Sequence, residues 1–120
     1  MVVESSKIIM DTYNKLLNDE RAYNVCISKK VIAGELVPIY ISFCFWYELN
    51  LISCKLYLNK DNKTFKLISG TTEVFRKIKY DDLFEKLNKG KFNIGDSKAM
   101  FNTSRYFDSN ISGIYILSKK

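Results

Sequence analysis

The chain of 120 residues contains no histidine. Histidine is the side chain that most often serves as a general base, and it is also the commonest transition-metal ligand in proteins. Its absence excludes serine–histidine and cysteine–histidine nucleophile pairs. The sequence also lacks the glycine-rich phosphate loop and the glycine fingerprint of dinucleotide-binding proteins. Binding functions and carboxylate-based metal chemistry are the classes that remain.

Cysteine is scarce and odd in number. Cys26, Cys44 and Cys54 each lie inside an apolar run, and no two of them form a CxxC pair. A zinc site built from cysteine alone usually needs four ligands, so the sequence does not predict one. Thiols in this pattern are typical of buried, free cysteines in a reducing compartment. We therefore expect no disulfide, no metal and no cofactor.

The acidic residues offer one alternative, a magnesium site made from Asp81 and Asp82 together with segment 96–98. Both groups stand where a helix is expected to begin. Aspartate is common at helix starts, because it accepts hydrogen bonds from free backbone amides and suits the helix dipole. Capping explains each acid without a ligand, so the sequence predicts that the protein is not an enzyme.

Long apolar runs, prolines and glycines are few. The longest apolar run, over 37–47, is far shorter than the roughly 20 residues that span a bilayer. The first seven residues lack the basic-then-apolar order of a signal peptide. One proline and five glycines leave no long linker, and 47% apolar residues are ordinary for a folded domain. We expect one domain over 1–120, located in the cytoplasm, with no membrane partner.

Hydrophobic spacing predicts one helix followed by four strands. Apolar residues recur at helical intervals over 4–18. The strands are predicted at 22–32, 37–47, 51–59 and 64–69, and the short segments between them are rich in turn-forming residues. Successive strands joined by short turns indicate an antiparallel meander. Phe43, Phe45, Leu56 and Leu58 are expected on its buried face.

The pattern after the fourth strand is less uniform. Residues 72–80 fit a strand and a helix about equally well. A helix then begins at Asp81 or Asp82 and ends where Lys89 is followed by Gly90. Further elements are expected at 96–107, a short helix, and at 113–118, a strand that rejoins the sheet. The predicted fold class is α+β: an N-terminal helix, a four-stranded antiparallel meander, then a helix and a C-terminal strand.

Positive charge is concentrated in the second half of the chain. Residues 1–54 carry five basic and six acidic side chains, whereas residues 55–120 carry fourteen and seven. This asymmetry points to a surface that meets something anionic, either nucleic acid or an acidic protein. Sixteen of the nineteen basic residues are lysines, and bidentate contacts to phosphate and guanine favour arginine. The lysine-rich surface also fits a simple role in solubility.

Two groups of residues are the candidates for binding. Lys55, Tyr57, Lys66 and Thr64 are expected on the open face of the sheet, where aromatic and basic side chains together bind single strands. Near the C-terminus an arginine lies among aromatics, which is typical of interface anchors. The predicted partner-binding residues are Lys55, Tyr57, Lys63, Lys66, Arg76, Lys77, Arg105 and Tyr106.

The sequence favours a small non-enzymatic interaction protein that acts stoichiometrically on a protein partner through its basic C-terminal half. Compact, motif-free chains of this kind are common among inhibitor, immunity and anti-defence proteins. The expected partner is an acidic protein surface or a nucleic-acid-handling protein. The alternative is a single-stranded nucleic-acid or RNA-binding module, whose binding would weaken steeply with salt.

Overall fold

The computed structural model describes residues 2–90, and the statements below refer to this part of the chain. It contains one long helix, five strands and a short helical segment. The elements are α1 (Val2–Leu17), β1 (Tyr23–Ile32), β2 (Glu35–Tyr47), β3 (Asn50–Leu58), β4 (Phe65–Ser69), β5 (Thr72–Ile78), the 3-10 turn η1 (Tyr80–Asp82) and α2 (Leu83–Lys89).

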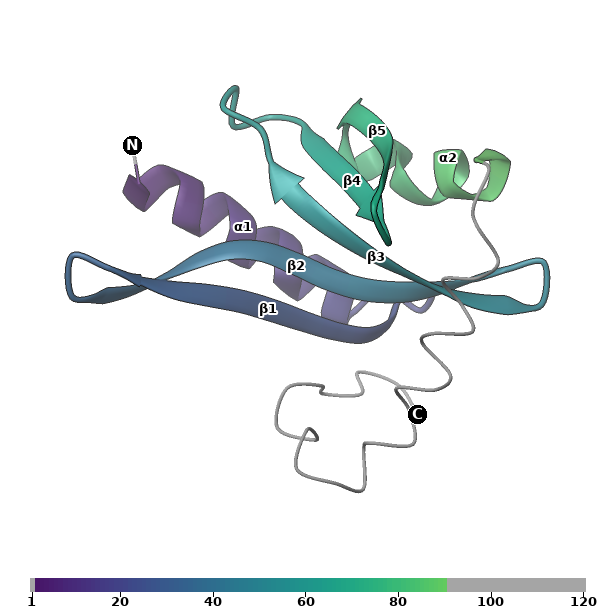
Figure 1. Ribbon diagram of the computed structural model, residues 1–120, viewed down its shortest axis with the longest axis horizontal. Helices are drawn as coiled ribbons and strands as arrows, with labels where there is room; N and C mark the ends of the chain where they lie inside the picture. Colours follow the sequence, from purple (N-terminus) through teal and green to yellow (C-terminus); the bar gives the residue numbers. More distant parts are fainter. Residues whose placement is uncertain (1, 91–120) are drawn as a thin grey trace, which may run out of the picture.

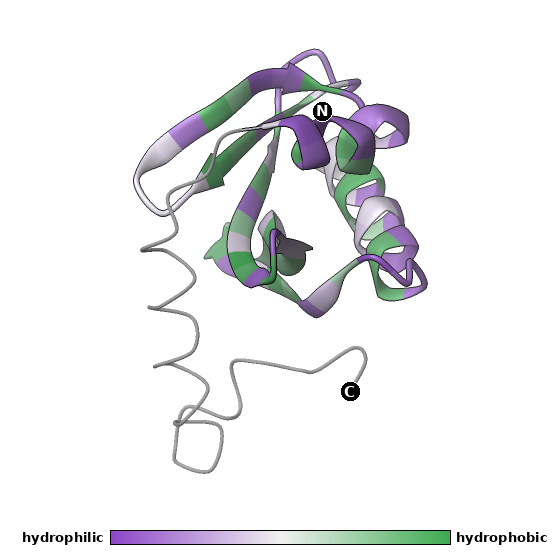
Figure 2. Cartoon of the chain, turned by 90° about the vertical axis from the view of Figure 1, so that its right-hand side faces the viewer, coloured by the Kyte–Doolittle hydropathy of each residue, from purple (hydrophilic) through white to green (hydrophobic). Residues whose placement is uncertain are grey.

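The strands form one antiparallel sheet in the order β1-β2-β3-β4-β5, so each strand pairs with its neighbour in sequence. The predicted α+β class and the antiparallel meander are therefore confirmed. Figure 1 views the sheet with α1 behind it, and Figure 2, turned by 90°, shows the helices along one side of the strands. The domain thus has two layers, with one face of the sheet covered by helices and the other face left open by them.

The predicted meander was one strand short. Segment 72–80, which fitted two structures equally, forms β5 over Thr72–Ile78 and pairs with β4. The pairing of Ser69 with Thr72 closes a tight turn in which Gly70 has a φ of +62°. Such a turn returns the chain along β4 and satisfies the backbone groups of that strand. The helix expected at 96–107 and the strand expected at 113–118 lie outside the described residues.

The helices predicted at 4–18 and from Asp81 or Asp82 are present with small differences. Helix α1 begins at Val2, so Ser5 lies inside it, and the Ser5 hydroxyl donates to Asn62 Oδ1 at 3.1 Å. Helix α2 ends at Lys89, and the Gly90 amide donates to the Leu87 carbonyl. Asp82 is the residue before α2, but its side chain makes no capping hydrogen bond. The acids at this helix start therefore act through their charge alone.

The hydrophobic core lies between the sheet and the helices. Phe43, Phe45 and Leu56 are at most 2% exposed, as predicted, whereas Leu58 at the end of β3 is only half-buried and packs against the edge of the core. The helices contribute the other side of the core. Their buried apolar side chains are Ile9 and Leu16 from α1, and Leu83, Phe84 and Leu87 from α2.

The three cysteines, all within the described residues, are buried and form no disulfide. Cys44 lies next to Asn24, whose amide Nδ2 donates to Sγ at 3.7 Å. Burial raises the pKa of the Cys44 thiol to about 12, so this thiol stays protonated at neutral pH. A protonated, buried thiol is a poor nucleophile, and we assign Cys44 a packing role.

Both hairpins at the ends of β2 close with two-residue turns. Ala33 and Gly34 have φ values of +53° and +81° between the paired residues Ile32 and Glu35. Positive φ at both central positions defines the type I′ turn, which matches the twist of antiparallel strands. Asparagine followed by glycine is the preferred pair in this turn, because alanine tolerates positive φ less well.

Replacing Ala33 with asparagine is expected to stabilise the domain by about 0.5–1 kcal/mol, because the exposed turn keeps its shape and loses backbone strain. The midpoint of urea unfolding measures this gain. Ala33→Val is the matched control and should lower the midpoint, since a β-branched residue is a poor occupant of positive φ. An unchanged or lower midpoint for Ala33→Asn would contradict the assigned turn.

Candidate functional site

The open face of the sheet gathers aromatic and basic side chains. From Tyr40 onward, residues of β2 alternate between the core and this face, and Tyr40 lies on the side opposite Phe43. Tyr40 pairs with Tyr57 on β3, and Tyr57 pairs with Lys66 on β4. Lys55 is two residues from Tyr57 and shares its face. Four side chains from three neighbouring strands therefore meet on the open face.

The geometry of these four side chains is specific. The Tyr40 and Tyr57 rings lie 5.0 Å apart between centroids with an interplanar angle of 37°. Lys55 Nζ is 5.1 Å from the centre of the Tyr40 ring, and Lys66 Nζ is 5.5 Å from the centre of the Tyr57 ring. Ammonium groups at this distance are attracted by the ring electrons, by about 0.5–1 kcal/mol at exposed sites. The contacts hold both lysines and both tyrosines in one arrangement.

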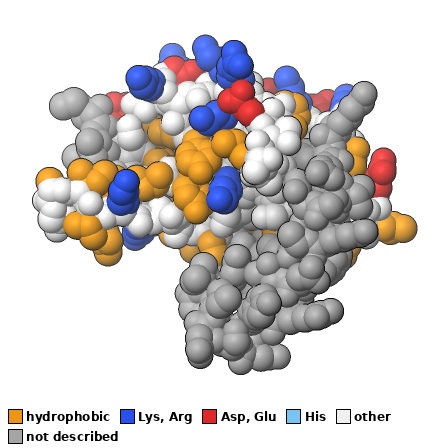
Figure 3. Space-filling view, in the orientation of Figure 1, with side chains coloured by type: hydrophobic (Ala, Val, Ile, Leu, Met, Phe, Trp, Pro, Cys, Tyr) orange, Lys and Arg blue, Asp and Glu red, His pale blue; other side chains and the backbone are white. Residues whose placement is uncertain are grey.

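Val31 and Leu36 pair across the tip of the β1–β2 hairpin, where they are 65% and 67% exposed. They lie on the other face, because a bulge in β2 between Pro38 and Tyr40 reverses the alternation of its side chains. We call Tyr40, Lys55, Tyr57 and Lys66 the outer-face patch. Figure 3 views the outer face and shows hydrophobic side chains over the middle of the sheet, with basic side chains beside them.

The predicted binding residues separate into three groups. The structure brings together Lys55, Tyr57 and Lys66. It places Lys63 in the β3–β4 turn and Thr64 beside it, where the Thr64 hydroxyl donates to Asp61 Oδ2 at 2.7 Å. The Thr64 side chain is therefore held within the turn by this hydrogen bond and is not part of the patch.

The remaining predicted binding residues lie elsewhere. Arg76 is on β5 and forms an ion pair with Glu73 at 3.5 Å. Lys77, also on β5, is exposed and lies near Asp61, whose pKa it helps to lower. Arg105 and Tyr106 lie outside the described residues. The expected interface is thus divided over more than one surface.

Sequence reasoning left one member of the patch, Tyr40, out of the predicted binding residues. Alternation along the strand placed Tyr40 on the correct face, but its contact with Tyr57 depends on the register of β2 against β3.

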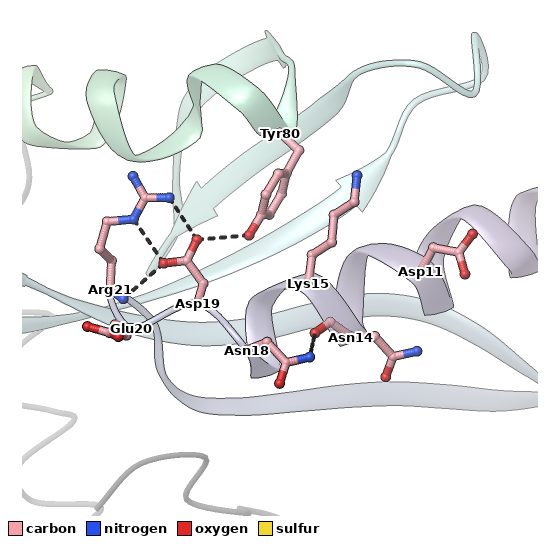
Figure 4. A pocket seen from close by; sticks show the side chains of 8 residues that line it. All are labelled: Asp11, Asn14, Lys15, Asn18, Asp19, Glu20, Arg21 and Tyr80. Carbon is pink, nitrogen blue, oxygen red and sulfur yellow. Dashed lines mark hydrogen bonds and ion pairs between the residues drawn. The ribbon is translucent and has the colours of Figure 1, made fainter.

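A second feature is an open hollow of about 790 Å³ beside the end of α1, with Asp19 and Tyr80 in its wall (Figure 4). Asp19 accepts hydrogen bonds from Arg21 Nε at 2.9 Å, from Arg21 Nη2 at 2.8 Å and from the Tyr80 hydroxyl at 3.0 Å. The Arg21 guanidinium also lies 4.4 Å from the centre of the Phe84 ring. The α1–β1 turn is thereby fastened to η1 and α2.

Protonation states in this hollow argue for a structural role. The Arg21 guanidinium holds the pKa of Asp19 down at about 2, against the opposing effect of partial burial. Burial, together with the charge of Asp19, raises the pKa of Tyr80 well above its usual value. Asp19 is therefore a carboxylate and Tyr80 a phenol across the neutral range. Neither group is poised to exchange protons near pH 7, which a general acid or base requires.

Residues 2–90 contain no group of three or more acidic or cysteine side chains placed to hold a metal ion. No helix in that range is long and apolar enough to cross a bilayer. Comparisons with protein-family models, with curated proteins and with solved structures return no match to this chain. The outer-face patch is thus the feature of the described chain from which a function can be argued.

Proposed function

We propose that this chain is a non-enzymatic binding protein that engages an acidic protein partner through the outer-face patch. The observation that carries the proposal is the Tyr40 and Tyr57 pair with an ammonium over each ring. Tyrosine offers a large, stiff contact area with a polar tip, and such residues dominate the energy of protein interfaces. The two lysines supply the positive potential that an acidic surface complements.

A single-stranded nucleic acid is the second candidate, because two tyrosines beside two lysines on an open sheet resemble a stacking platform. The ring geometry favours the protein partner. Each tyrosine already contacts the other ring and an ammonium group, so a base would have to displace these contacts to stack. Arginine, which both stacks on bases and binds phosphate, is absent from the patch.

A charge-reversal experiment tests the proposal. The Lys55→Glu/Lys66→Glu double variant is expected to lose its partner by on the order of tenfold or more, because reversed charges repel an acidic surface. Its matched control is Lys7→Glu/Lys86→Glu, which makes the same change of charge at exposed positions on α1 and α2. Quantitative mass spectrometry of proteins that co-purify with each tagged variant, after nuclease treatment, measures the difference.

The proposal requires one protein that is retained stoichiometrically by the wild type and by the control, and that is lost from the patch variant. Equal loss from both variants would show that only net charge matters and would contradict it. A parallel purification without nuclease tests the second candidate. Nucleic acid that co-purifies in that sample, and whose binding weakens steeply as salt rises, would favour nucleic-acid binding instead.

A further inference from the structure

A small hollow on the helix side of the sheet collects lysines from three separate segments. It measures about 240 Å³ and is lined by Lys15 of α1, Lys63 of the β3–β4 turn and Lys79 just before η1, together with Asp81. We call it the basic hollow. It lies against α1, which packs on the opposite side of the sheet from the outer-face patch, so it is independent of the function proposed above.

We propose that the basic hollow binds a phosphate-type dianion, either free phosphate or a phosphomonoester. Three ammonium groups and one carboxylate give the hollow a net charge of about +2, which a dianion would neutralise. Lysine is a common phosphate ligand that acts as a point charge, and each ammonium group has three donors. Three lysines placed around one hollow match the three terminal oxygens of a phosphomonoester.

The lysines of the basic hollow are available to a ligand. Within residues 2–90, no ion pair engages Lys15, Lys63 or Lys79. Lys15 Nζ lies 5.4 Å from the centre of the Tyr80 ring, a contact that positions the ammonium group but leaves its charge uncompensated. Like charges that gather at one hollow repel each other, and an anion between them removes this repulsion.

The walls that carry these lysines are held in place. The backbone amide of Lys63 donates to Asp61 Oδ1 at 2.8 Å, and the Thr64 amide donates to the same atom at 2.9 Å. The hydrogen bond from Ser5 to Asn62 joins this turn to α1. On the other side, the Tyr80 hydroxyl binds Asp19 and fixes η1. The hollow is therefore formed before a ligand arrives, which lowers the entropic cost of binding.

Size limits the class of ligand. Pockets for drug-sized molecules are usually about 300–1,000 Å³, and the basic hollow is smaller than that range. It accommodates a phosphate group with a few waters, but not a nucleotide together with its base. The floor includes Ile8 and the buried ring of Phe65, which keeps water away from one side of the anion. Charge attraction is stronger where water is excluded.

Titration of the ¹⁵N-labelled protein with inorganic phosphate, and separately with glycerol 2-phosphate, tests the proposal at constant ionic strength. Saturable shifts are expected at the amides of Lys63, Thr64 and residues 79–81. Lys63→Gln should weaken binding on the order of tenfold, as expected for the loss of one charge-assisted hydrogen bond. Asp81→Asn should strengthen it, because it removes the carboxylate that opposes the anion.

Lys60→Gln is the matched control. Lys60 is in the same turn and carries the same charge, but it does not line the basic hollow. Unchanged affinity in this control, with weaker binding in Lys63→Gln, supports the site, and the ligand that saturates at the lower concentration identifies the source of the phosphate group. Non-saturating shifts with both ligands would overturn the proposal, as would equal losses in the Lys60 and Lys63 variants. Melting curves establish that each exposed substitution leaves the domain folded.

Discussion

Phe45→Ala is expected to lower the free energy of unfolding by about 3–5 kcal/mol. Phe45 is 2% exposed on the inward face of β2, where it pairs with Ile52 on β3. Its ring also meets the Tyr47 ring edge to face, at 6.3 Å between centroids. Truncation would remove these contacts and leave a cavity that the strands on either side cannot close, because their backbones are hydrogen-bonded. Urea unfolding followed by circular dichroism measures the loss.

Leu49→Ala is the control for this experiment. Leu49 is also a large apolar residue, but it is 93% exposed in the turn between β2 and β3. Its truncation should change stability by no more than about 0.5 kcal/mol, as surface substitutions usually do. A loss below about 1 kcal/mol for Phe45→Ala would show that the inward face of β2 is wrongly assigned.

Asp19→Asn is expected to cost about 2 kcal/mol at pH 7, and this cost should vanish in acid. The pKa of Asp19 is about 2 in the folded chain, against an ordinary value of 3.8. A carboxyl group with a lowered pKa binds protons more readily in the unfolded chain, so acid favours unfolding. The stabilisation from Asp19 is therefore fully present above about pH 5 and is lost as the pH falls towards 2.

The difference between the unfolding free energies of wild type and Asp19→Asn, followed from pH 7 to pH 2, isolates this group. A difference is needed because the pKa of Asp61 is also lowered to about 2, mainly by the Lys63 and Thr64 amides, and titrates in the same range. Tyr80→Phe should remove a smaller part of the effect, since Arg21 still binds the carboxylate. Parallel pH curves for wild type and Asp19→Asn would refute the role assigned to Asp19.

Local patterns were enough for most of the elements. Alternation over 37–47 located β2 and identified its two faces from Tyr40 onward, because side chains of a strand point alternately to opposite sides whatever the strand pairs with. The bulge that reverses the faces before Tyr40 was missed. The end of α2 at Lys89 was also predicted, since glycine after a basic residue stops a helix locally. Segment 72–80 could not be assigned in this way. Its strand structure comes from pairing with β4, a contact that its own composition does not encode.

The candidate sites also combine features that local sequence patterns predict with features that only tertiary contacts create. The sequence alone determined the α+β class, the antiparallel meander and the common face of Lys55, Tyr57 and Lys66, because these follow from periodicities within single segments. Only the tertiary structure placed Tyr40 against Tyr57, through the register of two strands. The tertiary structure also placed Lys63 in the basic hollow, away from Lys66 on the outer face. Register and helix docking depend on contacts between residues far apart in the chain, and local spacing carries no information about them.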